Sequence, residues 1–374
     1  MFKLIALPYQ MVMPIMDVQE ALSQVVTFIF TDIHGEQAKL ENIMKFTGFL
    51  DKPEATAWFL GDYVDKGPDS SRTLKYIKAL KRRCGSRVNI LGGNHEVNFM
   101  RRIYDLAWSV SVTRTESGDI EDMNRVDWLD GADHAESVSR RITHEFVRGR
   151  MLASGYDMAN KIFLMHAGLD LDIVPYIAKT EPSVLSDGLI NFSALSRYFN
   201  ETIQEAARQE EAISTLQNEI ATPDSNEALL VQLEEKIARL EEFYENQPLF
   251  WFKKEIDGKT ICGPFWKNAA ALFDQYSDRQ EEKNALFGDV RSVVGHSVVP
   301  YFDKWKGWDV EGIISTPDGS FVVMDGGMAD CFSGNMVFMG ITRTGDLIGF
   351  VKATDDFSVD DWYCARIERK PKGS

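Results

Sequence analysis

Short clusters of aspartate, asparagine and histidine follow apolar runs at five places in the chain. The clusters are Thr31-Asp32-Ile33-His34-Gly35, Gly61-Asp62-Tyr63-Val64-Asp65-Lys66-Gly67, Gly93-Asn94-His95-Glu96, Met165-His166-Ala167-Gly168 and Gly295-His296-Ser297. They contain four of the chain's six histidines, which random placement would rarely achieve. The clusters therefore indicate a single shared site.

The side chains in these clusters match the ligands of a binuclear metal site. Asp32 and His34 can converge on one cation where the chain curls after a strand, and Asp62 can bridge two cations through its two oxygens. Asn94 offers an amide oxygen, and the later histidines offer imidazole nitrogens. This mixture suits Mn²⁺, Fe or Zn²⁺ better than an all-oxygen Ca²⁺ site. The absence of cysteine ligands argues against a structural zinc.

Such a site predicts phosphoester hydrolysis. Two cations about 3.5–4 Å apart can share a hydroxide and hold a phosphate, and that bridging hydroxide then attacks phosphorus in line with the leaving oxygen. His95 is placed to protonate the leaving oxygen, and Asp65 can hydrogen-bond His95 and keep it charged. A lone histidine after a strand is more often a packing residue, so the prediction depends on the ordered set.

Alternating strands and helices are expected to position the clusters. Strands are predicted at Val25 to Phe30, Ala57 to Leu60, Val88 to Leu91, Ile162 to Met165 and Ser292 to Val294, and helices at Glu36 to Phe49, Asp69 to Arg83 and Glu96 to Trp108. This βαβα order predicts a largely parallel sheet whose ligands lie at the carboxyl ends of its strands. Four more apolar runs between residues 312 and 352 predict an antiparallel second sheet.

Two segments are expected to be insertions. Residues 109–150 are polar and glycine-containing, and we expect one or two helices there. In residues 192–247, apolar positions repeat at 3-4 spacing on both sides of a proline turn at 222–226. This predicts an antiparallel helical hairpin packed along its a/d seam. The hairpin is either a structural or self-association element or a docking arm for a protein partner.

Bulk composition limits the possible partners. The chain has 374 residues, 44% of them apolar, which suits a single catalytic domain over residues 1–374. Its net charge of −16 disfavours nucleic acid and anionic membrane surfaces as main partners. No apolar run approaches a membrane span of about 18 residues, and the proline-interrupted start does not resemble a Sec signal peptide. The four scattered cysteines favour a reducing compartment, so we expect a cytoplasmic protein.

The ordered clusters resemble those of the phosphoprotein phosphatase (PPP) family of calcineurin-like metallophosphoesterases, over about residues 25 to 352. That family carries Gly-Asp-x-His-Gly, Gly-Asp-x-x-Asp-Arg-Gly, Gly-Asn-His-Glu and two later histidines. The resemblance implies an α/β fold of two mixed β-sheets flanked by helices.

The resemblance also implies two divalent cations, Mn²⁺ foremost and Fe or Zn²⁺ as alternatives, held by Asp32, His34, Asp62, Asn94, His166 and His296. In the family, the first Asp and His share one metal with the bridging Asp, while Asn and both later histidines hold the other. For this chain the assignment of His296 stays open. His95 would be the general acid and Asp65 its partner.

Departures from the family pattern concern the grip on phosphate. Lys66 stands where the family has an arginine, so a point charge replaces a bidentate fork. Gly92 stands at another arginine position, and Asn268 at a third, in a segment similar to Pro-x-Trp-x-Arg. The phosphate contacts we expect are Lys66, Asn94 and Lys267, with Arg101 and Arg102 as weaker candidates.

Two sequence features bear on the substrate. Met324-Asp325-Gly326-Gly327-Met328 resembles the Asp-x-Gly-Met of bacterial-type members, which include Shewanella-like phosphatases and symmetrical diadenosine tetraphosphate hydrolases. Glu96 favours a phosphatase, because those hydrolases usually read Gly-Asn-His-Asp. We therefore expect a protein phosphatase acting on phosphoserine or phosphothreonine, with phosphotyrosine as a further candidate. The alternatives are a dinucleotide polyphosphate hydrolase and a non-catalytic scaffold. The inserted hairpin also resembles that of Wip-type phosphatases, which implies, as an alternative location, translocation into a host cell by a non-Sec system.

Overall fold

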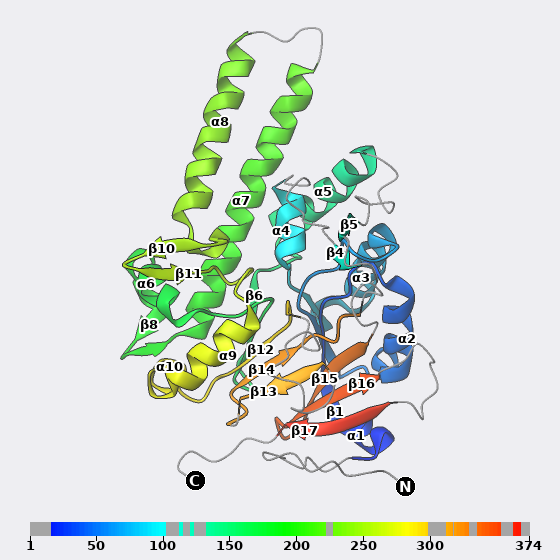
Figure 1. Ribbon diagram of the computed structural model, residues 1–374. Coiled ribbons are helices and arrows are strands. Elements are labelled where there is room, and N and C mark those ends of the chain that lie inside the picture. The colour runs from blue at the N-terminus through cyan, green and yellow to red at the C-terminus, as the bar shows by residue number, and fades with distance from the viewer. Residues whose placement is uncertain are drawn as a thin grey trace.

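Two mixed β-sheets form the centre of the molecule, with helices on their outer faces (Figure 1). This is a computed structural model, and it describes residues 16–101, 112–114, 120–122, 132–221, 227–297, 312–316, 318–328, 335–352 and 362–367. The first sheet has the order β17-β16-β15-β1-β2-β3, and the second has the order β13-β14-β12-β7-β6. The expected fold class is confirmed.

The first sheet combines parallel and antiparallel strands. Its strands are β1 (Val25–Phe30), β2 (Thr56–Phe59), β3 (Val88–Ile90), β15 (Met336–Thr342), β16 (Leu347–Lys352) and β17 (Tyr363–Ile367). The strands β1, β2 and β3 run parallel, as the βαβα order predicts, whereas β15 pairs antiparallel with β1. This differs from the expected separate antiparallel sheet, because the C-terminal strands extend the edge of β1.

The second sheet takes the remaining strands. They are β6 (Ser154–Asp157), β7 (Ile162–Met165), β12 (Arg291–Val294), β13 (Ile313–Ser315) and β14 (Phe321–Met324). The strand β12 lies parallel to both β7 and β14, while β13 and β6 close the edges in antiparallel orientation. Residues 312–352 are thus divided between the two sheets.

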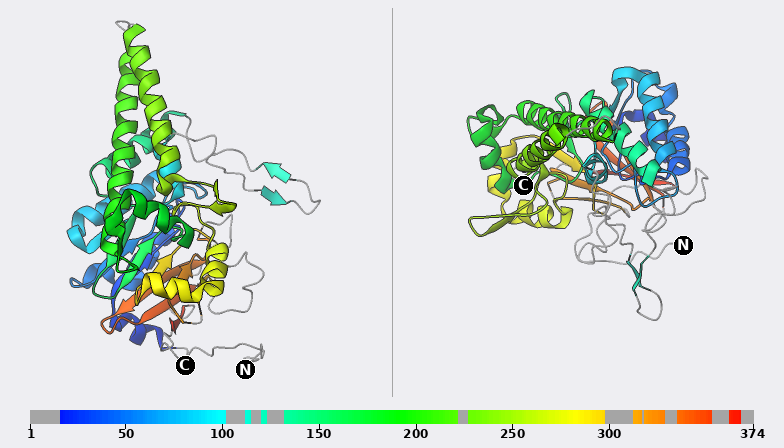
Figure 2. Two further views of the ribbon diagram at one scale, coloured as in Figure 1. Left: turned by 90° about the vertical axis from the view of Figure 1, so that its left-hand side faces the viewer. Right: turned by 90° about the horizontal axis from the view of Figure 1, so that it is seen from above.

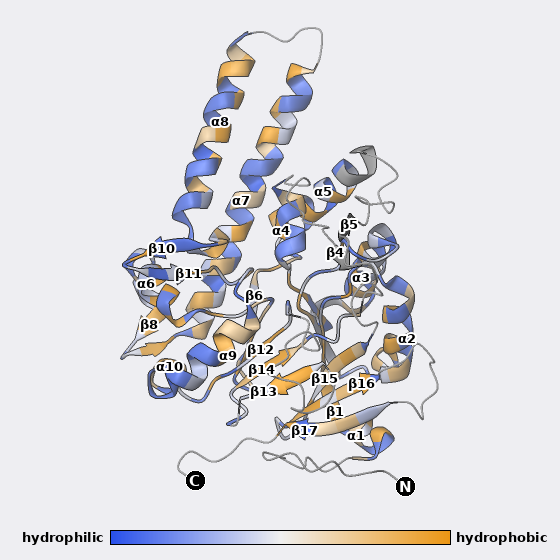
Figure 3. Cartoon of the chain, in the orientation of Figure 1, coloured by the Kyte–Doolittle hydropathy of each residue, from blue (hydrophilic) through white to orange (hydrophobic). Residues whose placement is uncertain are grey.

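Alternating side chains build two apolar layers. On β1, Phe28 and Phe30 join the cluster that includes the helices, whereas Ile29 joins a second cluster with residues of both sheets. On β7, Phe163 and Leu164 divide in the same way. Successive side chains of a strand point to opposite faces, so each sheet packs on helices with one face and on the other sheet with its second face. In Figure 3 the central strands β12, β13, β14 and β15 are accordingly coloured as hydrophobic.

Helices cover the outer faces of the sheets. Beside the first sheet lie α1 (Val18–Gln24), α2 (Gln37–Thr47) and α3 (Ser70–Cys84), and near the second sheet lie α6 (Val174–Thr180), α9 (Ala269–Asp278) and α10 (Gln280–Phe287) (Figure 1). The helix α3 shows the local reasons for these elements. Asp69 caps its start by accepting a hydrogen bond from the backbone N–H of Arg72, and Leu74, Ile77 and Leu80 form its buried face.

The first insertion is more varied than predicted. It contains α5 (Ala132–Val147), which agrees with the expected helix, and a pair of short strands, β4 (Val112–Arg114) and β5 (Ile120–Asp122), which the sequence did not suggest. The preceding helix α4 (Asn94–Met100) has its C-cap at Arg101, and its expected continuation to Trp108 lies outside the described residues.

The hairpin is present as α7 (Phe192–Ile220) and α8 (Glu227–Asn246), and it projects away from the sheets (Figure 2). Its turn at 222–226 lies outside the described residues. The predicted seam is closed near the base, where Leu240 and Tyr244 are buried. Farther out on α8, Leu230 and Val231 are each 49% exposed.

The remaining elements are short. They are β8 (Leu185–Ser186), β9 (Leu189–Ile190), β10 (Lys254–Ile256) and β11 (Lys259–Ile261), and the 3₁₀ helices Phe49–Asp51, Gly85–Arg87, Leu171–Ile173, Pro182–Val184 and Pro248–Phe250. Among the helices in the described ranges, none combines the length and apolar character needed to cross a membrane.

Candidate metal centre

The five polar clusters meet where the strands of both sheets end. Asp32 and His34 follow β1, Asp62 follows β2, and the Asn94 cluster follows β3, while His166 and His296 follow β7 and β12 of the second sheet. Backbone φ is positive at Asp32 (48°), His34 (46°), Asp62 (55°), Asp65 (70°) and His296 (70°). Left-handed backbone is costly for residues other than glycine and gathers at functional sites. The sharp turns after the strands aim these side chains into one space.

Three possible ligand atoms converge on Nε2 of His166. Its Nε2 lies 2.9 Å from Asn94 Oδ1, 3.1 Å from His296 Nδ1 and 3.3 Å from Asp62 Oδ2. Its Nδ1 lies 3.1 Å from the carbonyl oxygen of Leu60, which can only accept, so Nδ1 is the nitrogen that donates. In the neutral ring, the Nε2 lone pair would then point at other lone pairs. A cation resolves such an arrangement, so these four side chains fit one metal.

A second group of possible ligands, from the loop after β1, also lies at the site. His34 Nδ1 donates to the carbonyl oxygen of Val64 (3.1 Å), which directs its Nε2 toward Asp62 Oδ2 at 3.7 Å. Asp32 Oδ2 accepts from the backbone N–H of His296 at 2.9 Å and from the Thr31 hydroxyl, but its Oδ1 is buried with no hydrogen-bond partner. A buried unsatisfied carboxylate oxygen is costly, and a cation would satisfy it.

Asp62 lies between the two groups. Its Oδ2 is within 4 Å of nitrogens from His34, His95 and His166. Residues of both groups, His34-Asp62-His95 and Asp62-His166-His296, offer ligand atoms that lie within 4.8 Å of one another. The position of Asp62 fits a carboxylate that bridges two cations.

Burial sets the protonation of these ligands. It lowers the pKa of His34 to about 4 and that of His296 to about 3, so both imidazoles keep the lone pair that a metal needs. Burial also raises the pKa of Asp32 to about 6. Against the cost of its own burial, the Asp62 carboxylate raises the pKa of His166 to about 9, so a proton and a metal compete for the same Nε2.

His95 and Asp65 form an ion pair beside the ligands. His95 Nδ1 lies 2.8 Å from Asp65 Oδ2, and the ring edge with Nε2 lies 3.7 Å from Asp62 Oδ2. Burial alone would lower the pKa of His95, but Asp62 and Asp65 raise it to about 9. Burial likewise opposes the ionised form of Asp65, but the hydrogen bond to His95 lowers its pKa to about 2. The pair can thus present an imidazolium N–H at Nε2.

Residues 26–207 match the family of calcineurin-like phosphoesterases. The chain contains a calcineurin-like phosphoesterase domain. The matched segment includes the clusters from Asp32 to His166, and the structure adds His296 from β12.

Relatives of the phosphoesterase domain come from two substrate classes. The chain is 36% identical over 74 residues to a symmetrical bis(5'-nucleosyl)-tetraphosphatase of Buchnera aphidicola, covering 20% of this chain and 25% of that protein. It is 38% identical over 88 residues to a catalytic subunit of protein phosphatase 2A from Dictyostelium discoideum, covering 24% and 27%. The chain thus spans about a quarter of the length of these relatives. Among solved structures, a cold-active protein-tyrosine phosphatase of a psychrophilic Shewanella is similar with a TM-score of 0.47 and 15% identity, over 91% of this chain and 80% of that one.

Glu96 organises the loops of the phosphoesterase domain, a role that the sequence reasoning missed. Its carboxylate accepts backbone N–H groups of Asp62 and Gly93 at Oε2 (2.8 Å each) and of Tyr63 and Val64 at Oε1 (2.8 and 3.2 Å). It is fully buried. The signal in the sequence was a glutamate three residues after Gly93, which is the N3 position of a capping box on α4.

Asp325 is a second residue that the predicted site did not include. It follows β14 of the second sheet, is 2% exposed, and accepts the backbone N–H of Gly327. Burial, reinforced by the nearby charge of Asp32, raises its pKa well above the usual value. The resemblance of the segment 324–328 to a family motif was the available signal.

The predicted phosphate contacts of the phosphoesterase domain are placed differently from one another. Lys66 follows Asp65 in the same loop, and its backbone N–H donates to Asp65 Oδ1 (2.9 Å). The positive charge of Lys66 acts to lower the pKa of His95, so the two side chains are close enough to interact. Lys267 is buried, and its ammonium lies 2.5 Å from Asp170 Oδ2. Because the Lys267 ammonium is engaged by Asp170, Lys66 and Asn94 are better placed than Lys267 to contact a phosphate at the metal centre.

Structural roles account for the other departures from the arginine pattern. A Cβ on Gly92 would come 2.4 Å from the Phe146 ring of α5, so the inserted helix occupies the space of a side chain there. Asn268 caps α9 by accepting backbone N–H groups of Ala270 and Ala271. The Arg101 guanidinium stacks 4.1 Å above the Tyr244 ring at the base of the hairpin. Arg102 lies outside the described residues.

Proposed function

We propose that the chain is a metal-dependent phosphoprotein phosphatase that hydrolyses phosphoserine and phosphothreonine monoesters, with phosphotyrosine as a further substrate to be tested. The observation that carries the hydrolytic part is the convergence of acceptor atoms on Asp62, with the charged His95–Asp65 pair beside it. One group of residues can hold cations while another donates a proton. Phosphoester hydrolysis needs both.

The donor set fits two divalent cations. Asp32 and His34 would hold one, Asn94, His166 and His296 the other, and Asp62 both. Carboxylate, imidazole and amide ligands suit Mn²⁺, with Fe and Zn²⁺ as alternatives. When bound, the cations would supply an activated water and neutralise the charge on phosphate. Metal ligands need fixed orientation, which the carbonyl oxygens of Val64 and Leu60 supply for His34 and His166.

The protein's own residues would handle the proton. His95 would donate the proton at Nε2 to the leaving oxygen of the substrate, because its Nδ1 is held by Asp65. The negative charge of Asp65 keeps the imidazole protonated until that step. Lys66 would add positive charge at the phosphate as a single ammonium rather than an arginine fork.

Three features support a protein substrate. One relative is a catalytic subunit of protein phosphatase 2A. Glu96 occupies the last position of the Gly-Asn-His-Glu cluster, as in the phosphatases. The hairpin projects from the body and offers exposed apolar residues, which suits contact with a macromolecule and makes it a candidate docking arm (Figure 2). A cytoplasmic phosphatase, or one translocated into a host cell, is the corresponding setting.

A second candidate is hydrolysis of dinucleotide polyphosphates. It is favoured by the tetraphosphatase relative and by the segment Gly67-Pro68-Asp69-Ser70 after the second cluster. Both candidates use the same metal centre and differ in what occupies the space beside it. A non-catalytic scaffold is the third possibility, and the full ligand set argues against it.

A substrate panel distinguishes these functions. The metal-loaded protein would be assayed with Mn²⁺ on matched phosphoserine, phosphothreonine and phosphotyrosine peptides and on diadenosine tetraphosphate. We expect phosphate release from peptides, abolished by chelation and strongly reduced in His95→Ala. Fast turnover of the dinucleotide with no release from any peptide would reverse the choice of substrate. If the protein binds both metals but turns over none of these substrates, the result would favour the non-catalytic scaffold.

A further inference from the structure

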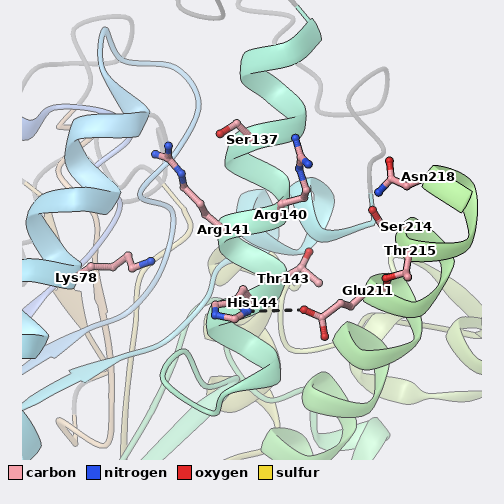
Figure 4. Close-up of a pocket in the computed structure, with 10 residues that line it drawn as sticks. All are labelled: Lys78, Ser137, Arg140, Arg141, Thr143, His144, Glu211, Ser214, Thr215 and Asn218. Carbon is pink, nitrogen blue, oxygen red and sulfur yellow. Dashed lines mark hydrogen bonds and ion pairs between the residues drawn. The ribbon is translucent and has the colours of Figure 1, made fainter. Parts of the chain in front are cut away.

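A polar groove lies between the inserted helix α5, the hairpin helix α7 and Lys78 of α3 (Figure 4). Its volume is about 410 Å³. None of its lining residues is a candidate metal ligand or a neighbour of His95 in the ion pair described above. The groove is therefore a separate feature from the metal centre.

The groove is formed by two matching helix faces. Ser137, Arg140, Arg141 and His144 on α5 follow the spacing i, i+3, i+4, i+7, and so do Glu211, Ser214, Thr215 and Asn218 on α7. Residues with this spacing share one face of a helix. The lining therefore consists of polar and charged residues from one face of each helix, together with Lys78.

The charge of the groove departs from that of the whole chain. The chain carries a net charge of −16, yet the lining has the cations of Lys78, Arg140 and Arg141 against the single carboxylate of Glu211. Lys78 is paired with Glu145 (2.7 Å), and His144 Nδ1 lies 3.7 Å from Glu211 Oε1. With Glu145 beside Lys78 and Glu136 beside Arg140, three carboxylates accompany the three cations, so the groove is close to neutral in an acidic protein.

The two arginines can bind an anion. Arg140 Nε lies 3.7 Å from Glu136, with 59% of the Arg140 side chain exposed, and Arg141 Nη1 donates to Ser71 Oγ at 3.2 Å. Each of these contacts involves one nitrogen of a guanidinium that carries five N–H donors. A guanidinium group is suited to bidentate binding of phosphate oxygens.

We propose that this groove binds a phosphorylated polyol, such as a sugar phosphate. The arginines would take the phosphate, and the hydroxyls of Ser137 and Ser214 with the amide of Asn218 would take the hydroxyls of the ligand. The hydroxyls of Thr143 and Thr215 already donate to backbone carbonyl oxygens of their own helices. The volume falls in the range of small-molecule pockets, about 300–1,000 Å³. The lining contains no Phe, Tyr or Trp on which a nucleobase could stack. A polyol therefore suits the groove better than a nucleotide.

Calorimetric titration tests the proposal. The full metal-loaded chain would carry His95→Ala to prevent turnover and would be titrated with glucose 6-phosphate, inorganic phosphate and glucose. We expect a binding event for glucose 6-phosphate that is tighter than for either fragment. Arg140→Ala should weaken that event roughly ten-fold through loss of a charge-assisted hydrogen bond. Arg82→Ala, an exposed cation on α3 outside the groove, is the matched control and should leave it unchanged.

Two further points keep the test decisive. Arg141→Lys keeps the charge and removes the fork, so it should weaken binding even if a variant without charge at 141 folds poorly. Equal binding to the parent, Arg140→Ala and Arg141→Lys would overturn the proposal. Equal affinities for inorganic phosphate and glucose 6-phosphate at the groove would also overturn it, since the polyol would then make no contact. Neither result depends on the substrate of the metal centre.

Discussion

Three histidines at the metal centre are each oriented by a hydrogen bond of one ring nitrogen, which leaves the other nitrogen for metal binding or proton transfer. Backbone carbonyl oxygens of Val64 and Leu60 fix Nδ1 of His34 and His166, and a carboxylate fixes Nδ1 of His95. His34 presents a lone pair and His95 presents a proton, whereas at His166 Nε2 a metal would have to displace the proton that Asp62 favours. The difference between His34 and His95 lies in the partner, because a carboxylate stabilises an imidazolium and a neutral carbonyl does so far less.

Replacing His95 separates proton donation from metal binding. We expect His95→Ala to lower kcat on phosphopeptides by roughly 10²–10⁴-fold, because a general acid is lost. Two metals per chain should remain, since the other ligands are untouched. Steady-state kinetics and metal analysis would be run with Asp65→Asn alongside, which should show a smaller loss. A fully active His95→Ala protein would exclude His95 as the acid.

Replacing Glu96 tests the loop contacts that surround the ligands. In Glu96→Gln, an amide NH₂ would face two of the four backbone N–H groups that the carboxylate now accepts. We expect a loss on the order of 3 kcal/mol in unfolding free energy, because hydrogen bonds to a buried charge are replaced by facing donors. Urea unfolding would measure it.

The control for Glu96 is a glutamate on the surface. Glu205→Gln removes a carboxylate that contacts Arg208 on the exposed side of α7, and it should change the unfolding free energy by less than about 0.5 kcal/mol. If Glu96→Gln is as stable as Glu205→Gln, the carboxylate of Glu96 does not hold the loops.

The ligand residues could be predicted from sequence because each follows an apolar run, and strand ends are where such sheets place ligands. The structure brings Asp32, His34, Asp62, Asn94, His166 and His296 together. The role of Glu96 could not be predicted, because it depends on three loops approaching one carboxylate. The ion pair of Lys267 with Asp170 could not be predicted either, because the two residues are 97 positions apart in the sequence and only the fold brings them together.

At the scale of elements, α4 links the metal centre to the hairpin. It begins at Asn94 and His95, and just past its last residue Arg101 stacks on Tyr244 of α8. The Tyr244 hydroxyl donates to Glu210 of α7 at 2.7 Å, so both hairpin helices join this contact. The base of the hairpin is thereby fixed beside α4, while its outer part extends away from the body (Figure 2).

The outer part of α8 allows a test of docking. Replacing Leu230 and Val231 by lysine should leave the unfolding free energy unchanged, because each is 49% exposed. Turnover of a small aryl phosphate should also stay the same, whereas kcat/KM for a phosphoprotein substrate should fall several-fold. Gln232→Lys, an exposed neighbour, adds the charge without removing apolar surface. Equal turnover of the phosphoprotein by all variants would show that this surface does not bind it.

Helices with clear periodicity could be predicted well from the sequence. The elements that pack against them, and the extent of their burial, could not. The 3-4 spacing from Leu230 to Tyr244 predicts the second helix of the hairpin, but periodicity alone does not show that α8 is buried only at Leu240 and Tyr244. The runs at 336–342 and 347–352 read as strands, yet sequence does not show that they extend the sheet of β1. Strand pairing is decided by tertiary contacts, and a short pair such as β4 and β5 leaves little pattern to detect.

For the whole molecule, the metal centre lies where the two sheets meet. Asp32, Asp62 and Asn94 come from the first sheet, and His166 and His296 come from the second. A cation that binds both sets stabilises the folded chain, because the unfolded chain does not present the ligands together. The acidic surface does not oppose the proposed activity, since the cations supply the positive charge that a phosphate needs.

Metal content of Asp62→Asn tests the central claim most directly. Asp62 is the carboxylate that both ligand groups share, so its loss should affect both cations rather than one. Elemental analysis after dialysis would compare the parent, Asp62→Asn and Asp172→Asn, the last being an acidic residue paired with Arg279 and Lys259 away from the ligands. We predict two divalent cations per chain in the parent and in Asp172→Asn, and none in Asp62→Asn. Two cations retained in Asp62→Asn would contradict the bridging role and with it the proposed centre.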